Sequence, residues 1–291
     1  MKAPRFSYVR PASLAEALRL LQEKGADARL LAGGQSLLAA LAFRLSEPGT
    51  LIDISKLPEL KGIAQAGNAI RVGAGVTHSA LGTSDLIRSH VPLVAQAIPH
   101  IAHPAIRNRG TIGGSLAYAD PAAELPACCL ALEATMIAAS PRGERRIKAG
   151  EFFTGLFTTA LAADEILTAI ELPVAAQGER AALVEIARRS GDYAMAGVAV
   201  KARVAGSAVS GVRAVFFGVG DAPVLAAGAN AALEGKPVTA EAIAASKAAL
   251  ARDLDPAPDQ HGGPEMKRHL AGVVLERALA RLSGANVEKA A

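Results

Sequence analysis

Two short segments of the chain pair adjacent glycines with small hydroxyl or amide side chains, and both are suited to holding phosphate groups. They are Ala32-Gly33-Gly34-Gln35-Ser36 and Thr111-Ile112-Gly113-Gly114-Ser115. Glycine adopts backbone conformations closed to other residues, and successive N–H groups in such a turn form a concave anion site. A helix starting just after Gly34 would add its dipole. Either segment alone is as well explained as a structural turn, but the two together favour a diphosphate, and hence a dinucleotide.

A third glycine segment, Gly73-Ala74-Gly75, follows a predicted strand and precedes a predicted helix, as in the Rossmann fingerprint. That fingerprint requires another glycine three positions after Gly75, where this chain has His78, and no acidic residue follows at a fitting strand end. We therefore predict a strand-to-helix turn in which Thr77 caps the helix.

The sequence gives little support to metal, disulfide or nucleophile chemistry. His100 and His103 have a spacing that suits a metal, but no third ligand is evident nearby, so no metal site is predicted. The only two cysteines, Cys128 and Cys129, are adjacent, which excludes a disulfide framework and a four-cysteine cluster. Their apolar neighbourhood predicts two buried thiols in a helix. Because no triad or paired carboxylates are evident, no catalytic residue is predicted.

Two further residues have both a structural and a functional interpretation. Asp120 precedes Pro121, as the N-cap of a helix ending near Glu133 would, and we expect capping to be at least part of its role. Tyr193 stands beside a Gly-Asp turn, where it suits stacking on a planar ligand and equally suits the end of a strand.

The composition is that of a globular protein of about two domains. The chain has 291 residues, of which 51% are hydrophobic and 20% charged, and its net charge is +4. The densest basic cluster, Arg142, Arg145 and Arg146, falls at a predicted hairpin tip, so no nucleic-acid partner is expected. No apolar run reaches the roughly 18 residues of a membrane span. Because Met1 to Ser13 lacks the apolar region of a signal peptide, we expect a cytoplasmic protein.

Hydrophobic spacing and turn residues predict the elements that position these segments. Ser13 and Glu16 form a capping box that predicts a helix ending at Gly25. Strands are predicted at 28–32, 50–54, 62–65, 69–73, 135–139, 145–148, 165–172, 194–204 and 209–219. Helices are predicted after Gly34 to about 43, in short segments over 77–101, and at 121–133, 224–233, 240–254 and 264–282. A domain boundary is predicted near 177–179.

In this order, the motifs resemble the FAD-binding middle subunit of the molybdenum hydroxylases, a family that includes bacterial carbon monoxide dehydrogenase and xanthine dehydrogenase. The resemblance extends from Phe6–Pro11 through both double-glycine segments to Gly191–Ala194, and it is strongest over His103–Pro126. Gln35 stands where carbon monoxide enzymes carry histidine, and Ser115 where many members carry asparagine. Both replacements still form hydrogen bonds, but they weaken a specific assignment to carbon monoxide chemistry.

The resemblance implies an α+β fold. A two-lobed FAD-binding domain of the vanillyl-alcohol-oxidase-like (PCMH) type would span 1–176, with lobes at about 1–57 and 58–176. A C-terminal domain of the carbon monoxide dehydrogenase flavoprotein type, with a three-stranded antiparallel sheet and a helix bundle, would span 177–291. The double-glycine segments would hold the FAD diphosphate, Asp120 would lie near the ribityl and flavin part, and Tyr193 and Leu167 would lie beside the ring. The implied cofactor contacts are Ala32, Gly33, Gly34, Gln35, Ser36, Thr111, Ile112, Gly113, Gly114, Ser115, Asp120, Leu167 and Tyr193.

The implied function is electron transfer within an oxidoreductase complex. Electrons from a large molybdenum-cofactor subunit would pass through two-iron two-sulfur clusters of a small subunit to the FAD, and from there to an external acceptor. The expected assembly is a dimer of heterotrimers. Scarce cysteine agrees with clusters carried on a partner chain. The alternatives are a self-contained FAD oxidase or reductase of the same fold and a non-redox assembly subunit, which two intact glycine segments disfavour.

Overall fold

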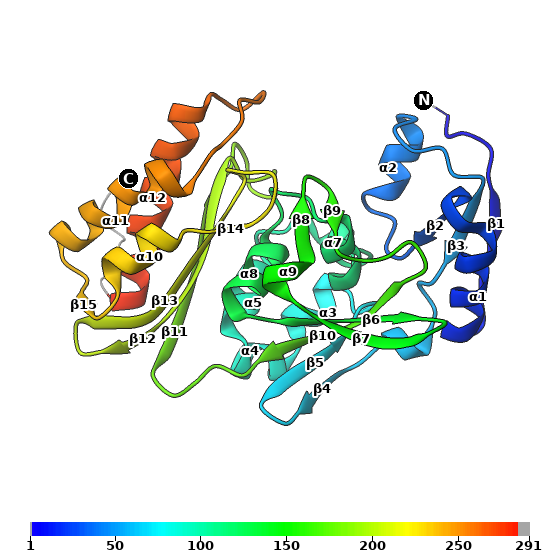
Figure 1. The fold of residues 1–291 in the computed structure, drawn as a ribbon, viewed down its shortest axis with the longest axis horizontal. Helices are drawn as coiled ribbons and strands as arrows, with labels where there is room; N and C mark the ends of the chain where they lie inside the picture. Colours follow the sequence, from blue (N-terminus) through cyan, green and yellow to red (C-terminus); the bar gives the residue numbers. More distant parts are fainter. Residues whose placement is uncertain (1, 285–291) are drawn as a thin grey trace.

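The first unit of the structure is a small parallel sheet with two helices (Figure 1). The computed structural model describes residues 2–284, so the domain limits expected at 1 and 291 lie outside the described residues. The strands are β1 (Ser7–Val9), β2 (Ala28–Leu31) and β3 (Thr50–Asp53), in the order β1-β3-β2, and the helices are α1 (Leu14–Lys24) and α2 (Leu37–Ala42).

Helix α1 begins and ends where the sequence predicts. The Ser13 hydroxyl accepts a hydrogen bond from the Glu16 N–H, and the Glu16 carboxylate accepts one from the Ala12 N–H. Gly25 ends the helix with φ +54°, in the left-handed region that favours glycine. The helix packs against β2 and β3 through its apolar stripe of Ala17, Leu18 and Leu21, all buried.

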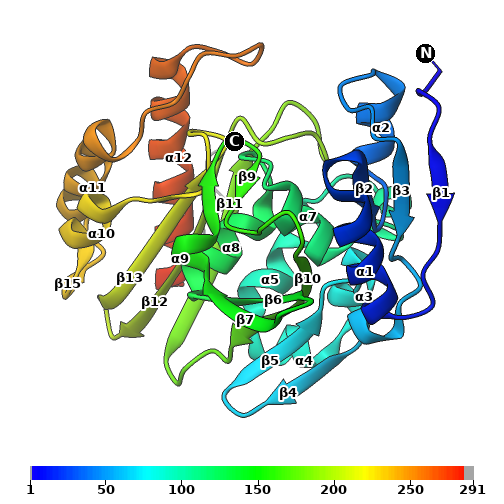
Figure 2. The ribbon, with the colours of Figure 1, turned by 45° about the vertical axis from the view of Figure 1, so that its right-hand side comes forward.

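The second unit is a five-stranded antiparallel sheet with helices against it. The strand order is β4-β5-β10-β6-β7, and α3, α4 and α5 gather behind β5 and β10 in Figure 2. The strands are β4 (Ile63–Ala66), β5 (Ala69–Gly73), β6 (Thr135–Ser140), β7 (Gly143–Lys148) and β10 (Ile166–Pro173), with a small hairpin of β8 (Phe153–Gly155) and β9 (Thr158–Thr159). The helices are α3 (His78–Thr83), α4 (Asp85–His90), α5 (Pro92–Ala97), α6 (Pro104–Arg107), α7 (Ile112–Tyr118), α8 (Glu124–Leu132) and α9 (Ala149–Phe152).

Helix α8 lies at the centre of the molecule, and all nine of its residues are buried. Cys128 and Cys129 are fully buried in it and free of disulfide bonding, which confirms the expected buried thiols. Burial raises the pKa of the Cys129 thiol to about 12. The start predicted for this helix is wrong, because it begins at Glu124 rather than Pro121. The Asp120 carboxylate instead accepts a hydrogen bond from the Ala122 N–H and closes the turn before the helix.

The third unit is an antiparallel sheet covered on one face by three helices, at the left of Figure 1. Its long strands are β11 (Glu179–Ile186), β12 (Ala196–Ala205) and β13 (Ala208–Phe217), and the two-residue strands β14 (Val224–Leu225) and β15 (Lys236–Pro237) both pair with β13. The helices are α10 (Ala227–Leu233), α11 (Ala240–Asp253) and α12 (Pro264–Ser283). The expected α+β class, with an antiparallel sheet and helices at the C-terminal end, is therefore observed. The expected count of three strands holds only for the long strands, because β14 and β15 bring the sheet to five.

Several elements differ from the sequence-based expectation. Strand β11 was not predicted, and neither was the segment containing α9, β8 and β9. Helix α10 begins at Ala227 rather than Val224, because Val224 and Leu225 pair with β13. The predicted boundary at 177–179 falls at the start of β11. Within residues 2–284, no helix is long and apolar enough to cross a membrane.

Arg213 on β13 links the second and third units. Its guanidinium donates to the Ala131 carbonyl (3.1 Å) and the Leu130 carbonyl (3.0 Å) at the C-terminal end of α8. We expect Arg213→Gln to lower the free energy of unfolding by about 1–3 kcal/mol, because two buried carbonyls lose a charged donor. Urea unfolding measures this loss. The exposed Arg203 supplies the control, since Arg203→Gln should change the free energy by less than about 0.5 kcal/mol. Equal effects of both variants would contradict the proposed link.

Candidate functional site

A cavity of about 790 Å³, here called the central cavity, lies between the first two units and reaches the loop at 191–193. This volume is in the range of small-molecule and cofactor sites. The residues predicted to contact a cofactor that line it are Ala32, Gly33, Gly34, Gln35, Ser36, Thr111, Gly113, Gly114, Ser115, Asp120, Leu167 and Tyr193. Ile112 does not line the cavity, because its side chain is fully buried in the core.

The first double-glycine segment offers a free backbone cradle. Gly34 adopts φ +75°, and the Gln35 amide donates to the Gly33 carbonyl (2.9 Å), which holds the turn closed. None of the N–H groups from Gly33 to Ser36 donates to an acceptor within residues 2–284. Unpaired N–H groups gathered at one edge of a cavity suit the oxygens of a diphosphate.

Gly33 is required for a different reason, a close approach between the two lobes. A Cβ atom at Gly33 would lie 2.2 Å from the Arg109 carbonyl oxygen and 2.8 Å from the Gly110 Cα. Both neighbours are backbone atoms and cannot move aside cheaply. The first segment therefore rests directly on the chain that leads into the second.

The second double-glycine segment is not the open turn that the sequence predicts. Thr111 is the N-cap of α7, and its hydroxyl accepts from the Gly114 N–H (3.1 Å). The N–H groups of Ile112 and Gly113 donate to the carbonyls of Val76 and Ala74, and that of Ser115 donates to Thr111. The backbone N–H groups of residues 112–115 are therefore all hydrogen-bonded within the chain and are not free to bind a phosphate. This segment offers the cavity only the side-chain-free surface of its two glycines and the Ser115 hydroxyl.

His78, which stands where the Rossmann fingerprint would need a glycine, was not predicted as a site residue, yet it lines the central cavity beside Gly110. It is 6% exposed, and within the described residues neither ring nitrogen has a hydrogen-bond partner. Burial lowers the pKa of His78 to about 4, so the ring is neutral near pH 7. The ring nitrogens at this cavity wall are therefore available to hydrogen-bond a polar ligand.

Asp120, Tyr193 and Leu167 give the cavity lining acidic, aromatic and apolar side chains. Burial raises the pKa of the Asp120 carboxyl above its usual value. Tyr193 is 62% exposed, and its partial burial together with the charge of Asp120 raises the pKa of its hydroxyl. Leu167, 5% exposed, adds an apolar wall from β10. A planar, uncharged ring suits these side chains better than a phosphate does.

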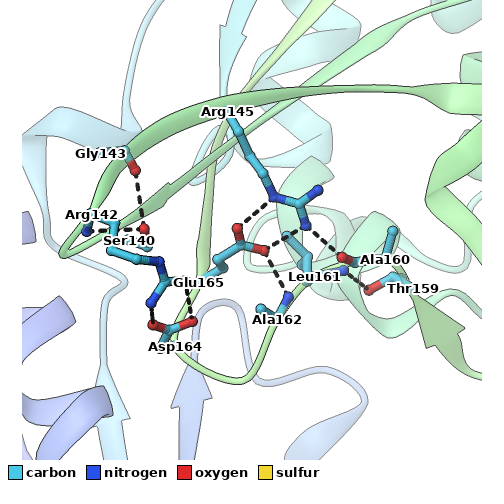
Figure 3. Close-up of polar contacts among 10 residues, drawn as sticks. All are labelled: Ser140, Arg142, Gly143, Arg145, Thr159, Ala160, Leu161, Ala162, Asp164 and Glu165. Carbon is cyan, nitrogen blue, oxygen red and sulfur yellow. Dashed lines mark hydrogen bonds and ion pairs between the residues drawn. The ribbon is translucent and has the colours of Figure 1, made fainter.

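Arginines of the β6–β7 hairpin clamp the loop at 160–165, which forms one wall of the cavity (Figure 3). Arg145 pairs with both oxygens of Glu165 (2.6 and 2.8 Å) and donates to the Ala160 carbonyl (2.6 Å). Arg142 pairs with Asp164 in the same manner. The arginine cluster, interpreted from the sequence as a solvated hairpin tip, therefore holds a cavity wall. The Arg145 guanidinium also lowers the pKa of Glu165.

Residues 4–175 match the family model of the FAD binding domain in molybdopterin dehydrogenase, and residues 181–282 match the CO dehydrogenase flavoprotein C-terminal domain. The chain belongs to this family. FAD is therefore its cofactor, and the chain is an electron-transfer flavoprotein subunit of the molybdenum hydroxylase type. The free N–H cradle, the side-chain-free wall and the orphaned His78 fit such a cofactor.

Individual relatives are similar to this chain over nearly their whole length. The chain is 39% identical to the carbon monoxide dehydrogenase medium chain of Hydrogenophaga pseudoflava, covering 96% of this chain and 97% of that one. It is also 39% identical to the nicotine 6-hydroxylase medium subunit of Paenarthrobacter nicotinovorans, over 96% and 98%. Among solved structures, quinoline 2-oxidoreductase from Pseudomonas putida 86 superposes with a TM-score of 0.93 at 38% identity, over 98% of this chain and 99% of that one.

The described residues contain no group of three or more histidine, cysteine, aspartate or glutamate side chains placed to hold a metal ion. His100, considered with His103 as a metal ligand, instead has its Nδ1 3.1 Å from a carboxylate oxygen of Glu185.

The buried His78 makes the free energy of unfolding depend on pH. Its pKa is about 4 in the folded chain against about 6.5 when unfolded, so the unfolded state binds more protons between these values. This contribution is complete above pH 6.5 and is lost as the pH falls towards 4. We expect His78→Gln to flatten this part of the curve of unfolding free energy against pH. Replacement of the exposed His269 by Gln should leave the curve unchanged, and a wild-type curve in both variants would refute the assignment.

The clamp on the cavity wall gives a prediction about cofactor affinity. Arg145→Gln removes the bidentate pair and leaves Glu165, whose side chain is 4% exposed, without its charged partner. We expect the FAD dissociation constant to rise about tenfold, equivalent to about 1.4 kcal/mol. Arg146→Gln is the matched control, because Arg146 pairs with Glu171, which does not line the cavity. Flavin fluorescence titration measures both, and equal affinities would show that the clamp does not shape the site.

Proposed function

We propose that this chain receives electrons from iron–sulfur clusters of a small partner subunit and passes them to an external acceptor. The electrons would originate at a molybdenum cofactor on a large subunit, and the complex would be a dimer of heterotrimers. Bound FAD supplies a carrier that exchanges electrons singly and in pairs. The observation that carries the proposal is the near full-length match to proteins named as medium chains of dehydrogenases and hydroxylases.

The residues of this chain would bind and orient the cofactor rather than transform a substrate. The free N–H groups of Gly33 to Ser36 would bind the diphosphate, and the Gly113–Gly114 wall would admit it closely. Asp120 would lie near the ribityl part, and Leu167 and Tyr193 would bracket the ring. Ile112 would contribute only through the core beneath the site. We propose domain limits at 176 and 177 on the same basis.

The alternative, a self-contained FAD oxidase or reductase, finds less support. Such an enzyme needs a substrate pocket with its own catalytic groups, whereas the third unit is a sheet whose helix-covered face is filled by apolar side chains. The two free, buried cysteines fit a reducing compartment, so we also propose a cytoplasmic location.

Purification of the tagged chain from its own organism tests the proposal. We expect large and small subunits to co-purify, with FAD, iron and molybdenum in the preparation. In Gly34→Val the iron and molybdenum should remain while FAD is lost, because φ +75° and the Leu31 and Leu38 side chains exclude a branched side chain there. Substrate should then still reduce the clusters, but electrons should no longer reach an acceptor dye.

Gly150→Val is the matched control, since a Cβ at Gly150 meets nothing within 4 Å. This variant should keep its FAD and its dye reduction. A tagged chain that turns over substrate alone, without iron or molybdenum, would establish the self-contained alternative instead.

A further inference from the structure

Arg107, the last residue of α6, does not line the central cavity, but its guanidinium binds three carbonyl groups of the turn before that helix. Its Nη1 donates to the carbonyls of Ile101 (2.8 Å) and Ala102 (2.8 Å), and at a longer distance to that of Pro99 (3.4 Å). Within residues 2–284, no other donor hydrogen-bonds to these carbonyls. One charged donor therefore satisfies the backbone of the whole turn.

This turn needs support because Ala102 adopts a backbone conformation that alanine disfavours. Its φ is +43°, in the left-handed region where a Cβ atom crowds the backbone. Such a conformation persists only where the surrounding contacts hold it in place. The Arg107 guanidinium supplies one of these contacts directly at the Ala102 carbonyl.

The carbonyl group that Arg107 binds is also in close contact with the loop that carries Tyr193. A Cβ atom at Gly191 would lie 2.8 Å from the oxygen and 3.0 Å from the carbon of the Ala102 carbonyl. Gly191, Asp192 and Tyr193 line the central cavity, as does Ala102. The turn and the loop therefore meet backbone against backbone, and a shift of the Ala102 carbonyl moves the loop with it.

Few other contacts fix the loop over 188–193, which connects β11 and β12. In the described part of the chain, its one side-chain hydrogen bond joins the Arg188 guanidinium to the Gln260 carbonyl (3.0 Å). The Tyr193 side chain is 62% exposed, so packing does little to hold it. The position of the Tyr193 ring therefore depends on where Gly191 rests.

We propose that Arg107 is a positioning residue for the flavin. By holding the Ala102 carbonyl it fixes the contact with Gly191, and through the loop it keeps the Tyr193 ring beside the isoalloxazine. The proposal rests on the proposed placement of Tyr193 at the flavin ring. A loop that moves away would expose the isoalloxazine to water and change the electrostatic surroundings that the protein gives it.

Limited digestion of the FAD-free full-length chain with trypsin tests the link between Arg107 and the loop. Trypsin cleaves after Arg188 and Arg189, which are exposed there. We expect Arg107→Met to be cleaved at these sites about tenfold faster than the wild type, the factor that corresponds to loss of one charged hydrogen bond. Arg107→Lys keeps a charged donor and should be cleaved at close to the wild-type rate. Arg88→Met is the matched control, because Arg88 also donates to a carbonyl, that of Gly82 (3.4 Å), and neither residue lines the cavity.

Cleavage of Arg107→Met at the wild-type rate would overturn the proposal. Gly191→Ala reaches the same loop from the other side and leaves Arg107 intact, so it serves even where Arg107→Met does not fold. The added methyl group does not fit against the Ala102 carbonyl, and φ +82° also disfavours alanine. We therefore expect faster cleavage in Gly191→Ala as well. A wild-type rate in this variant would show that the loop does not depend on this contact, and would overturn the proposal.

Flavin fluorescence of the reconstituted full-length chain tests the effect on the cofactor. A tyrosine against the ring quenches the emission by giving an electron to the excited flavin and taking it back. The chain has three tyrosines and no tryptophan, and of these only Tyr118 and Tyr193 line the central cavity. The measurements are therefore made in a Tyr118→Phe background, which keeps an aromatic ring against Phe157. In that background Tyr193→Leu should raise the emission, and Arg107→Met should raise it to the same level.

The double variant separates this role from a general loosening of the structure. Tyr193→Leu combined with Arg107→Met should emit no more than either variant alone, because both act on one contact. Increases that add, or unchanged emission in Arg107→Met alone, would overturn the proposal. Unchanged emission in Tyr193→Leu would overturn the placement of Tyr193 and the proposal with it. None of these measurements needs a partner subunit, so failure of the proposed complex is recognised separately, by the absence of co-purifying subunits.

Discussion

The shape of the site depends on a close backbone contact between two lobes of the chain. Gly33, at the end of a parallel strand, lies on the carbonyl of Arg109 and the Cα of Gly110 so closely that a single methyl group would separate them. This approach brings the free N–H groups of the first lobe to face the α7 wall of the second. Beneath it, a shared core that includes Ile52, Ile54, Ala139 and Ile166 also holds the two lobes together.

The cavity built on this contact is lined by groups of different character. The unpaired N–H groups of Gly33 to Ser36 are donors suited to phosphate oxygens, whereas Asp120, Leu167 and Tyr193 give the same cavity acidic, apolar and aromatic side chains. The salt bridge between Arg145 and Glu165 holds the 160–165 wall in place without adding an uncompensated charge to it.

The sequence predicted much of the local structure because the signals were local. The capping box at Ser13, the hairpin around Gly143 and the last helix could be recognised from spacing alone, and the structure confirms them. The family resemblance then placed the cofactor. The residues proposed to touch it are concentrated in segments that were already evident as glycine motifs.

What the sequence did not predict depended on contacts between distant residues. The N–H groups of Ile112 and Gly113 are hydrogen-bonded to the carbonyls of Val76 and Ala74, which lie far away in the sequence. No local sequence pattern predicts such a contact. The pairing of His100 with Glu185 joins residues of different units, and the apolar strand β11 carried no turn or alternation signal strong enough to define it. Helix α8 starts late because Asp120 closes a turn of its own instead of capping the helix.

The burial of Cys128 and Cys129 has a consequence for durability. Peroxide and disulfides react with thiolates rather than with thiols. Both thiols are buried in α8, and burial raises their pKa values, so they stay protonated. A flavin that passes electrons to dioxygen generates peroxide within its own binding site. This chain exposes no cysteine there to be oxidised or cross-linked, and the most exposed sulfur-containing residue among those described is Met266, in the first turn of α12.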